Sequence, residues 1–408
     1  MPDNRRVIIT TPARRRGVLK TRSILRNRSR YYYKIYPENT IPEKKWLTTH
    51  SPIFRDIFES DPEWQETRNL QQLDFTDMNE QSPIKNFFKT RDDITTKIFL
   101  ARLLQRKEIQ YSDVIGLTGP TGSAAPNIIE SRPDFYPPTL VCESGRVDPI
   151  LSENQALYQA DKPGKWYLKP SKGSGGSGIT IVSSPQKARE HFFKKARGMP
   201  EDIAERYPLK AKNQKADYVL QRGIERPLLL QGFKFDMRVI LLFTFNQKRH
   251  FKSYVYKDAF LRVSTKPYQE DSNNPLINLT NLTFHKKQQS VIGKTYTYKS
   301  RDFYQATYPK IHEACREIVD RLRDHLIPEP YKGYEIMGFD FMFDEDLKPY
   351  LLEINRFVGW PRDSKNKSVV NLIYGLMREA INLAIKPLIN PSYKPSLGGW
   401  DPLLTFSI

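Results

Sequence analysis

Two carboxylates and one amide near the end of the chain have the chemistry of a divalent cation site. Residues 338–355 show the alternation of two strands joined by a tight turn just before Leu347. This pairing places Asp340 opposite Glu353, and Asn355 shares the face of Glu353 because strand side chains repeat every two residues. Facing carboxylates repel unless a cation lies between them, and an all-oxygen ligand set suits Mg²⁺ better than zinc. In the alternative reading, each acid pairs with an arginine or faces water.

A glycine-rich hairpin has the composition of a phosphate-binding loop. A strand-like stretch at Trp166–Lys169 leads into SKGSGGSG at 171–178, and a second stretch follows at Ile179–Val182. Glycines let the backbone approach a ligand and turn N–H groups toward phosphate oxygens, while Lys169 and Lys172 supply positive charge. A strand follows the loop where a Rossmann fold needs a helix, and the Walker order of residues is absent. A flexible surface hairpin is the alternative.

Charged residues alternate at the start of an apolar strand. Lys234, Asp236 and Arg238 are separated by apolar residues, so the three charges share one face, and Arg262 lies one hairpin later. Planar guanidinium groups can stabilise a transferred phosphoryl group or an acyl phosphate, although a surface ladder of salt bridges is the alternative. No HExxH, GxSxG, HRD or DFG sequence occurs, so metal-hydrolase, serine-hydrolase and protein-kinase chemistry have no basis here.

Length and composition indicate a globular chain of two or three domains. The 408 residues include 65 Lys and Arg against 46 Asp and Glu, a formal net charge of +19, and 38% hydrophobic residues. Cys142 and Cys315 lie far apart in sequence and predict neither a disulfide framework nor a zinc site. The longest apolar run, Val239–Phe245, is too short to cross a membrane, and no signal-peptide pattern follows the first methionine. We therefore expect a soluble intracellular protein that does not insert in a membrane.

The first 30 residues form a strongly basic segment with ten Lys or Arg and one acid, Asp3. Such a segment has too little apolar surface to offset its ordering entropy, so we expect a disordered arm when it is unbound. Its charge would attract a polyanion, whether nucleic acid, an acidic protein tail or an anionic membrane surface. A mitochondrial transit peptide and a solvated tail are the alternatives.

Beyond about residue 150, strand-like runs alternate with helical patterns near 186–206, 303–326 and 368–387, which predicts an α/β or α+β fold. Thr90 could begin an earlier helix, and the polar stretch 264–300 would be long for a structureless loop. The expected domains are a basic arm over 1–30, an N-terminal domain over 31–150, a central subdomain with the glycine hairpin over 151–235, a C-terminal subdomain with the metal site over 236–390, and a tail over 391–408.

These motifs, in this order, resemble the tubulin tyrosine ligase-like family of ATP-grasp amino acid ligases. The likeness covers roughly residues 90–385 and is strongest in KPSKGSGGSGI, LQRGIERPLLLQGFKFDMRVILLF, NLTN and GFDFMFDEDLKPYLLEIN. The resemblance implies an ATP-grasp fold, with N-terminal, central and C-terminal subdomains packed around an ATP cleft, and it implies ATP and Mg²⁺ as cofactors.

The resemblance also assigns roles to residues. The nucleotide would contact Lys169, Lys172, Gly173, Gly175, Gly176, Ser177, Gly178, Gln221, Arg222, Gly223 and Ile224. The catalytic side chains would be Lys234, Asp236, Arg238, Arg262 and Asn281; the first four would surround the γ-phosphate and the acceptor carboxylate, and Asn281 would lie near the reacting groups. The metal ligands would be Asp340, Glu353 and Asn355.

The implied activity is ATP-dependent attachment of free Tyr, Glu or Gly, through an amide bond, to a carboxylate of an acidic protein tail, with tubulin the favoured acceptor. We expect a monomer that is cytoplasmic or associated with the cytoskeleton. The family usually has a small residue after Asn355, but this chain continues with Arg356–Arg362 (RFVGWPR), which leaves the amino acid and the acceptor open. The alternatives are an ATP-grasp carboxylate-amine ligase with a non-tubulin acceptor, and a non-catalytic basic module that binds nucleic acid or microtubules.

Overall fold

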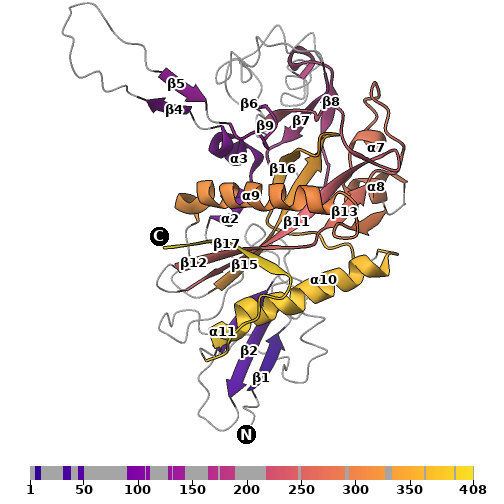
Figure 1. Ribbon diagram of the computed structural model, residues 1–408. Coiled ribbons are helices and arrows are strands. Elements are labelled where there is room, and N and C mark those ends of the chain that lie inside the picture. Colours follow the sequence, from indigo (N-terminus) through magenta and orange to yellow (C-terminus); the bar gives the residue numbers. More distant parts are fainter. Residues whose placement is uncertain are drawn as a thin grey trace, which may run out of the picture.

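The structure is a computed structural model (Figure 1). It describes residues 90–105, 132–142, 164–172, 175–188, 217–246, 250–289, 294–326, 333–362, 364–389 and 392–407. For five strands it describes the backbone alone: β1 (Arg5–Thr10), β2 (Tyr31–Pro37) and β3 (Lys45–Thr49), which form one small sheet, and β4 (Lys107–Gln110) and β5 (Asn127–Glu130), which form another.

A large antiparallel sheet is built around the long strand β11 (Phe233–Phe245). One edge of β11 pairs with β13 (Phe260–Val263) and then with β12 (His250–Tyr256), and the other edge pairs with β15 (Gly333–Phe343). The sheet is completed by β10 (Leu229–Leu230) on β11, β14 (Thr295–Thr297) on β13, β16 (Pro349–Asn355) on β15, and β17 (Trp400–Ser407) on β12.

Helices cover both faces of β11 beyond its charged start, which explains the continuous apolar run Val239–Phe243. Helix α9 (Tyr304–Leu322) packs in one core with Leu241 and alternate residues of β11. Helix α10 (Lys367–Ala380) packs in a second core with Leu242 on the opposite face. Figure 1 shows the two helices on either side of the sheet. The 3-10 turn η2 (Arg323–His325) follows α9, and the π-helical stretch η3 (Ile381–Ile385) and α11 (Lys386–Ile389) extend α10.

A second antiparallel sheet carries the glycine hairpin. Its strands lie in the order β6 (Thr139–Cys142), β9 (Tyr218–Arg222), β7 (Trp166–Pro170) and β8 (Thr180–Val182). Two further pairs of helices lie near this sheet and the large one: α2 (Arg91–Ile94) with α3 (Lys97–Leu104), and α7 (Pro275–Asn278) with α8 (Leu282–Gln289).

The mixed α/β fold class is confirmed, and all strand pairs in the described part of the chain are antiparallel. The helices predicted near 303–326 and 368–387 are α9 and α10 with their extensions. The stretch 264–300 contains α7, α8 and β14 and is therefore not a structureless loop. Within the described ranges, no helix is long and apolar enough to cross a membrane.

Some elements differ from the sequence-based expectation. Thr90 is the N-cap position of α2, as predicted, but its hydroxyl donates to the carbonyl of His325 and does not cap the helix. The predicted helix is divided at residues 95–96, and Thr96 caps α3 by accepting a hydrogen bond from the Phe99 backbone N–H at 3.3 Å. The boundary expected after residue 235 falls inside β11, and the expected tail contributes β17 to the large sheet. The basic arm lies outside the described residues except for the strand β1, so its disorder stays a prediction.

Candidate active site

A pocket lies between the sheet that carries the glycine hairpin and the large sheet, and it encloses about 730 Å³ of empty space, open solvent included. Strands β7 and β9 line one side, β11, β15 and β16 line the other, and the segment before α8 closes one end. Twelve of the predicted site residues line this pocket: Lys169, Gly176, Ser177, Gln221, Arg222, Gly223, Ile224, Lys234, Asp236, Asn281, Asp340 and Glu353.

The remaining predicted residues lie around the pocket or behind it. Lys172 is exposed, and Gly175 and Gly178 belong to the glycine loop without lining the pocket. Asn355 lies beside the two predicted acidic ligands, as described below. Gly173 lies outside the described residues. Arg238 and Arg262 are buried behind the pocket wall.

Two buried lysines face the pocket with neutral partners. The Lys169 ammonium donates to Gln221 Oε1 at 2.5 Å, and the Lys234 ammonium donates to the Tyr167 hydroxyl at 2.9 Å. Within the described ranges, neither lysine forms an ion pair. Burial lowers the pKa of each lysine to about 8. Cations that are buried beside neutral groups are suited to an anionic ligand, because its charge would offset their desolvation.

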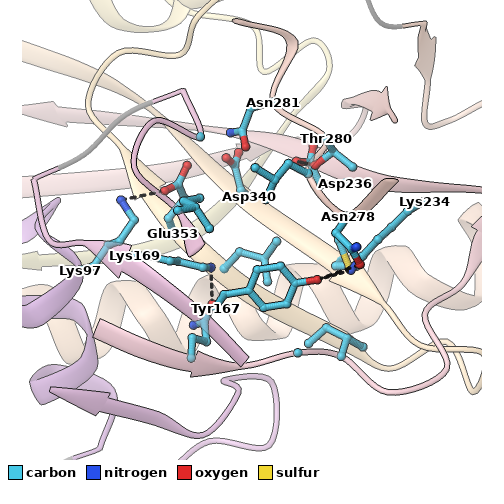
Figure 2. A pocket seen from close by; sticks show the side chains of 18 of the residues that line it. Lys97, Tyr167, Lys169, Lys234, Asp236, Asn278, Thr280, Asn281, Asp340 and Glu353 are labelled. Atoms are coloured by element: carbon cyan, nitrogen blue, oxygen red, sulfur yellow. Dashed lines mark hydrogen bonds and ion pairs between the residues drawn. The ribbon is translucent and has the colours of Figure 1, made fainter. Parts of the chain in front are cut away.

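Acidic side chains face these lysines. In the view of Figure 2, Glu353, Asp340 and Asp236 lie along one side of the pocket, and Lys169 and Lys234 lie along the other. One side of the pocket therefore has two lysines that form no ion pair among the described residues, and the other side has three carboxylates, each paired with a lysine or an arginine.

Lys97 is a pocket residue that the sequence analysis missed. Its ammonium lies 3.1 Å from Glu353 Oε2 (Figure 2), and its backbone N–H donates to the Ser171 carbonyl at the start of the glycine loop. Burial alone would raise the pKa of Glu353, but the charges of Lys97 and Lys169 outweigh it and hold that pKa well below its usual range. The sequence contained an indication of this position, because Lys97 precedes Ala101 by four residues and so lies on the same buried face of the helix.

The two arginines are bound by the acids of neighbouring strands. Arg262 pairs across β11 and β13 with Asp236 and donates to both of its carboxylate oxygens, at 2.6 and 2.8 Å. Arg238 pairs across β11 and β15 with Asp340, and its Nε and Nη2 groups each donate a hydrogen bond to the Asp340 carboxylate. Arg262 also reaches Asp340 at 2.7 Å. The arginines therefore fix the acids, and their expected place near the γ-phosphate and the acceptor carboxylate stays a prediction.

Gly338 makes room for Arg238. A Cβ on Gly338 would overlap the Cδ of Arg238, so a glycine is required beside this guanidinium. The Nη1 group of Arg238 donates to the carbonyl of Val358, in the segment that follows Asn355. The same arginine therefore links the pocket acid Asp340 to that segment.

The predicted pairing of Asp340 with Glu353 is confirmed, but a bulge produces it. Near the turn, Phe341 pairs with Leu351, and the register shifts by one residue before Asp340 pairs with Glu353. Leu352 is the extra residue, and both Leu352 and Glu353 line the pocket. The bulge therefore places an apolar side chain and a carboxylate next to each other on the pocket floor.

The residues present fit a divalent cation. The Asn355 amide nitrogen lies 3.0 Å from Asp340 Oδ2 and 3.3 Å from Glu353 Oε1, and a half turn of the amide would bring its oxygen to the same place. Among the residues that the structure describes, no cluster of three or more His, Cys, Asp or Glu could hold a metal. A cation here would thus use two carboxylates and the Asn355 amide, a hard oxygen set that suits Mg²⁺.

The residues also fit a nucleoside triphosphate. Gly176 has a φ of +75°, and a Cβ there would lie 2.9 Å from Asn281 Oδ1, so the glycine loop packs closely on the segment before α8. Gly223 packs against the backbone of Lys165, where a Cβ would lie 2.9 Å from the carbonyl oxygen. Met342 and Leu352 give the pocket an apolar floor near this edge, and Lys169 and Lys234 supply the positive charge for phosphates.

Comparison with known proteins agrees with this arrangement. The model of the tubulin-tyrosine ligase family matches residues 147–392. A probable alpha-tubulin polyglutamylase Ttll1 of Tetrahymena thermophila is 30% identical over 237 residues, which is 54% of this chain and 54% of that protein. The tubulin polyglutamylase TTLL7 of Mus musculus is 24% identical over 76% of this chain and 33% of that protein. The tubulin glycylase 3E of Tetrahymena thermophila is 27% identical over 47% of this chain and 14% of that protein.

The chain thus spans about half the length of the first of these relatives and less of the other two. The family match itself covers more than half of the 408 residues and includes the glycine hairpin, the paired arginines and the bulged hairpin. On this match, the chain belongs to the tubulin-tyrosine ligase family.

Proposed function

We propose that the protein is an ATP-dependent ligase that joins a free amino acid, through an amide bond, to a carboxylate of an acidic protein tail. The observation that carries the proposal is the pair of buried lysines, Lys169 and Lys234, that face three carboxylates across one pocket without an ion pair of their own in the described ranges. A polyphosphate would complement the lysines, and a divalent cation would complement the carboxylates. The names of the relatives support tubulin as the acceptor and favour glutamate or glycine over tyrosine.

The proposed chemistry has two steps. A carboxylate oxygen of the acceptor takes the γ-phosphoryl group of ATP, ADP leaves, and an acyl phosphate forms. The amine nitrogen of the free amino acid then attacks the carbonyl carbon, phosphate leaves, the nitrogen loses a proton, and an amide results. Such catalysis depends on positioning and on charge neutralisation more than on a tuned acid or base.

The residues of the pocket have distinct tasks in this scheme. Lys169 and Lys234 would bind phosphate oxygens, because both are buried cations that lack a charged partner among the described residues. Asp340, Glu353 and Asn355 would hold Mg²⁺, which would supply charge neutralisation for the transferred phosphoryl group. Arg238 and Arg262 would keep Asp340 in place. We place this activity in the cytoplasm or on the cytoskeleton, where such an acceptor occurs.

A labelling experiment tests the proposal. The full chain is incubated with ATP, Mg²⁺ and tubulin, and with one radiolabelled amino acid at a time: glutamate, glycine or tyrosine. We expect acid-stable label on tubulin with glutamate or glycine, dependent on ATP and lost in Glu353→Gln. Tubulin from which the acidic tails have been removed by protease is the control for the acceptor. No ATP-dependent label with any of the three amino acids would contradict the ligase proposal.

A further inference from the structure

The segment Arg356–Lys367 follows β16 and leads into α10, and its start is fixed to the large sheet. The carbonyl of Val358 accepts a hydrogen bond from Arg238. The ring of Trp360 packs on Phe260, with ring centroids 6.3 Å apart. The beginning of this segment is therefore held by the same arginine that binds a pocket carboxylate.

The end of the segment is fixed to β14. The Ser364 hydroxyl lies 2.6 Å from the Thr295 hydroxyl, and the Asn366 amide donates to the Thr295 carbonyl at 3.0 Å. Asn366 also caps α10, because its side chain accepts from the Ser368 backbone N–H. The segment is thus attached at both ends by short polar residues and tryptophan packing, and none of these contacts uses a basic side chain of the segment.

Several basic side chains of the segment are exposed. Arg362, Lys365 and Lys367 are exposed, and Lys294 is exposed next to Thr295 on the neighbouring strand. We call these four residues, together with Arg356, the basic strip. The sequence from Arg356 to Lys367 contains one acid, Asp363, and β14 and its neighbours from 286 to 301 contain none. The strip therefore carries a strong excess of positive charge beside the pocket.

The strip begins close to the predicted reaction site. Arg356 follows Glu353 by three residues, so the two Cα atoms lie within about 11 Å of each other by the reach of the chain. Phe357 is 36% exposed, and the Arg356 guanidinium lies over its ring at 5.1 Å. The strip thus combines exposed cations with one exposed aromatic ring at the end nearest the pocket.

We propose that the basic strip binds the acidic residues that flank the modified carboxylate of the acceptor, and that Phe357 contacts an apolar residue among them. This inference rests on the proposed ligase function. A tail whose carboxylate enters the pocket brings further carboxylates next to ATP. These carboxylates and the phosphates of ATP repel each other unless cations lie beside them. The strip begins three residues after Glu353, and its far end is held at Thr295, the strand partner of Arg262, so its cations can neutralise several of these carboxylates. A nucleic acid would meet the same charges but would have no carboxylate for the pocket.

A charge-reversal experiment on the full chain tests the strip. The variant R362E/K365E/K367E is compared with R316E/R378E/K394E, which changes the net charge equally at exposed basic residues of α9, α10 and the 392–399 segment. The probe is a short fluorescein-labelled peptide with a run of glutamates, followed by fluorescence anisotropy. Binding of Mg²⁺ and ATP is measured separately by calorimetry. We expect peptide affinity to fall about tenfold or more in the strip variant and less than about twofold in the control, with ATP affinity unchanged in both.

The two levels of the proposal fail separately. If peptide affinity falls equally in both variants, or does not change in the strip variant, the proposed role of the basic strip is overturned. ATP binding and labelling of tubulin would then still support the proposed ligase function. If the wild-type chain does not bind ATP, while peptide binding still depends on the strip, the proposed ligase function is overturned and the strip is not. A uridine oligonucleotide that binds the strip more tightly than the peptide would reject the acidic peptide as its partner. As a further arm, Phe357→Ala should weaken a glutamate peptide that contains a leucine more than one that does not.

Discussion

The ammonium of Lys97 lies 3.1 Å from Glu353 Oε2, so helix α3 supplies a charge to a strand that follows it by some 250 residues. Both side chains are largely buried, and the pair lies at the pocket end where the cation ligands converge. Lys97 also lies outside the segment matched by the family model. The N-terminal region is therefore part of the site.

Replacing Lys97 by methionine should weaken ATP use. The Met side chain keeps the apolar stem but leaves Glu353 without its closest cation, so we expect the KM for ATP with Mg²⁺ to rise by about tenfold. Lys97→Arg, which keeps the charge, should stay within about threefold of wild type. Steady-state kinetics with varied ATP measure both. A KM that is unchanged in the Met variant would show that the ion pair is only structural.

Removing the charge of Glu353 should have a larger effect on turnover. Glu353→Gln keeps the size of the side chain but removes a proposed Mg²⁺ ligand, so kcat should fall by about two orders of magnitude or more. Glu345→Gln is the matched control, because Glu345 is exposed at the turn of the same hairpin. The assay is run at saturating Mg²⁺. Near-normal turnover of the Gln variant under that condition would refute the cation site.

Binding of ATP should take up protons near pH 8. Burial lowers the pKa of Lys169 and of Lys234 to about 8, so each lysine is partly neutral in the free protein at that pH. A bound polyphosphate favours the charged forms and raises both pKa values, which draws protons from solution. At about pH 6 both lysines are already protonated, so the uptake should vanish.

Calorimetry in two buffers of different ionisation enthalpy measures this proton uptake. Lys169→Met should reduce the uptake at pH 8, while Lys172→Met, which changes an exposed lysine of the same loop, should leave it unchanged. Release of protons at pH 8, or no exchange at all, would count against a phosphate ligand at these lysines.

The glycine beside Arg238 should be intolerant of a side chain. Gly338→Ala places a Cβ on the Cδ of Arg238 in a buried strand, so the free energy of unfolding should fall by about 1–3 kcal/mol. Gly375→Ala is the control, since no atom lies within 4 Å of a Cβ there and the position is inside α10, where alanine stabilises by up to about 1 kcal/mol. Urea denaturation of the two variants compares them. If Gly338→Ala were as stable as the wild type, Arg238 would be free to move aside and the prediction would be wrong.

Local patterns predicted much of this fold. The alternation in β11 and in the hairpin of β15 and β16 defined their faces, because a two-residue period is readable without any tertiary knowledge. Twelve predicted residues accordingly line one pocket. The bulge at Leu352 was not readable, since an extra residue is set by the packing on both sides of the strand. The predicted turn position would not pair Phe341 with Leu351, as the structure does near the turn. The bulge shifts the register by one residue, and this shift restores the predicted pairing of Asp340 with Glu353.

The partners of the charged residues were harder to predict. Sequence placed Arg238 on a charged face and Arg262 one hairpin later, but it could not tell that the acids directly opposite in the sheet would bind them. Those contacts depend on which strands become neighbours, and β13 and β15 are separated by 70 residues of chain. Lys97 was missed for the same reason, because its partner lies on a distant strand.

The edge strand β17 has a practical consequence for producing this protein. It covers β12 along residues 250–256, yet it lies beyond the last residue of the family match. A fragment trimmed to 147–392 would leave the backbone N–H and C=O groups of β12 open to pairing with another molecule, and such edges promote aggregation. Expression limits chosen from sequence similarity alone would therefore expose a strand edge that promotes aggregation, whereas limits that retain residue 407 would keep β12 paired with β17.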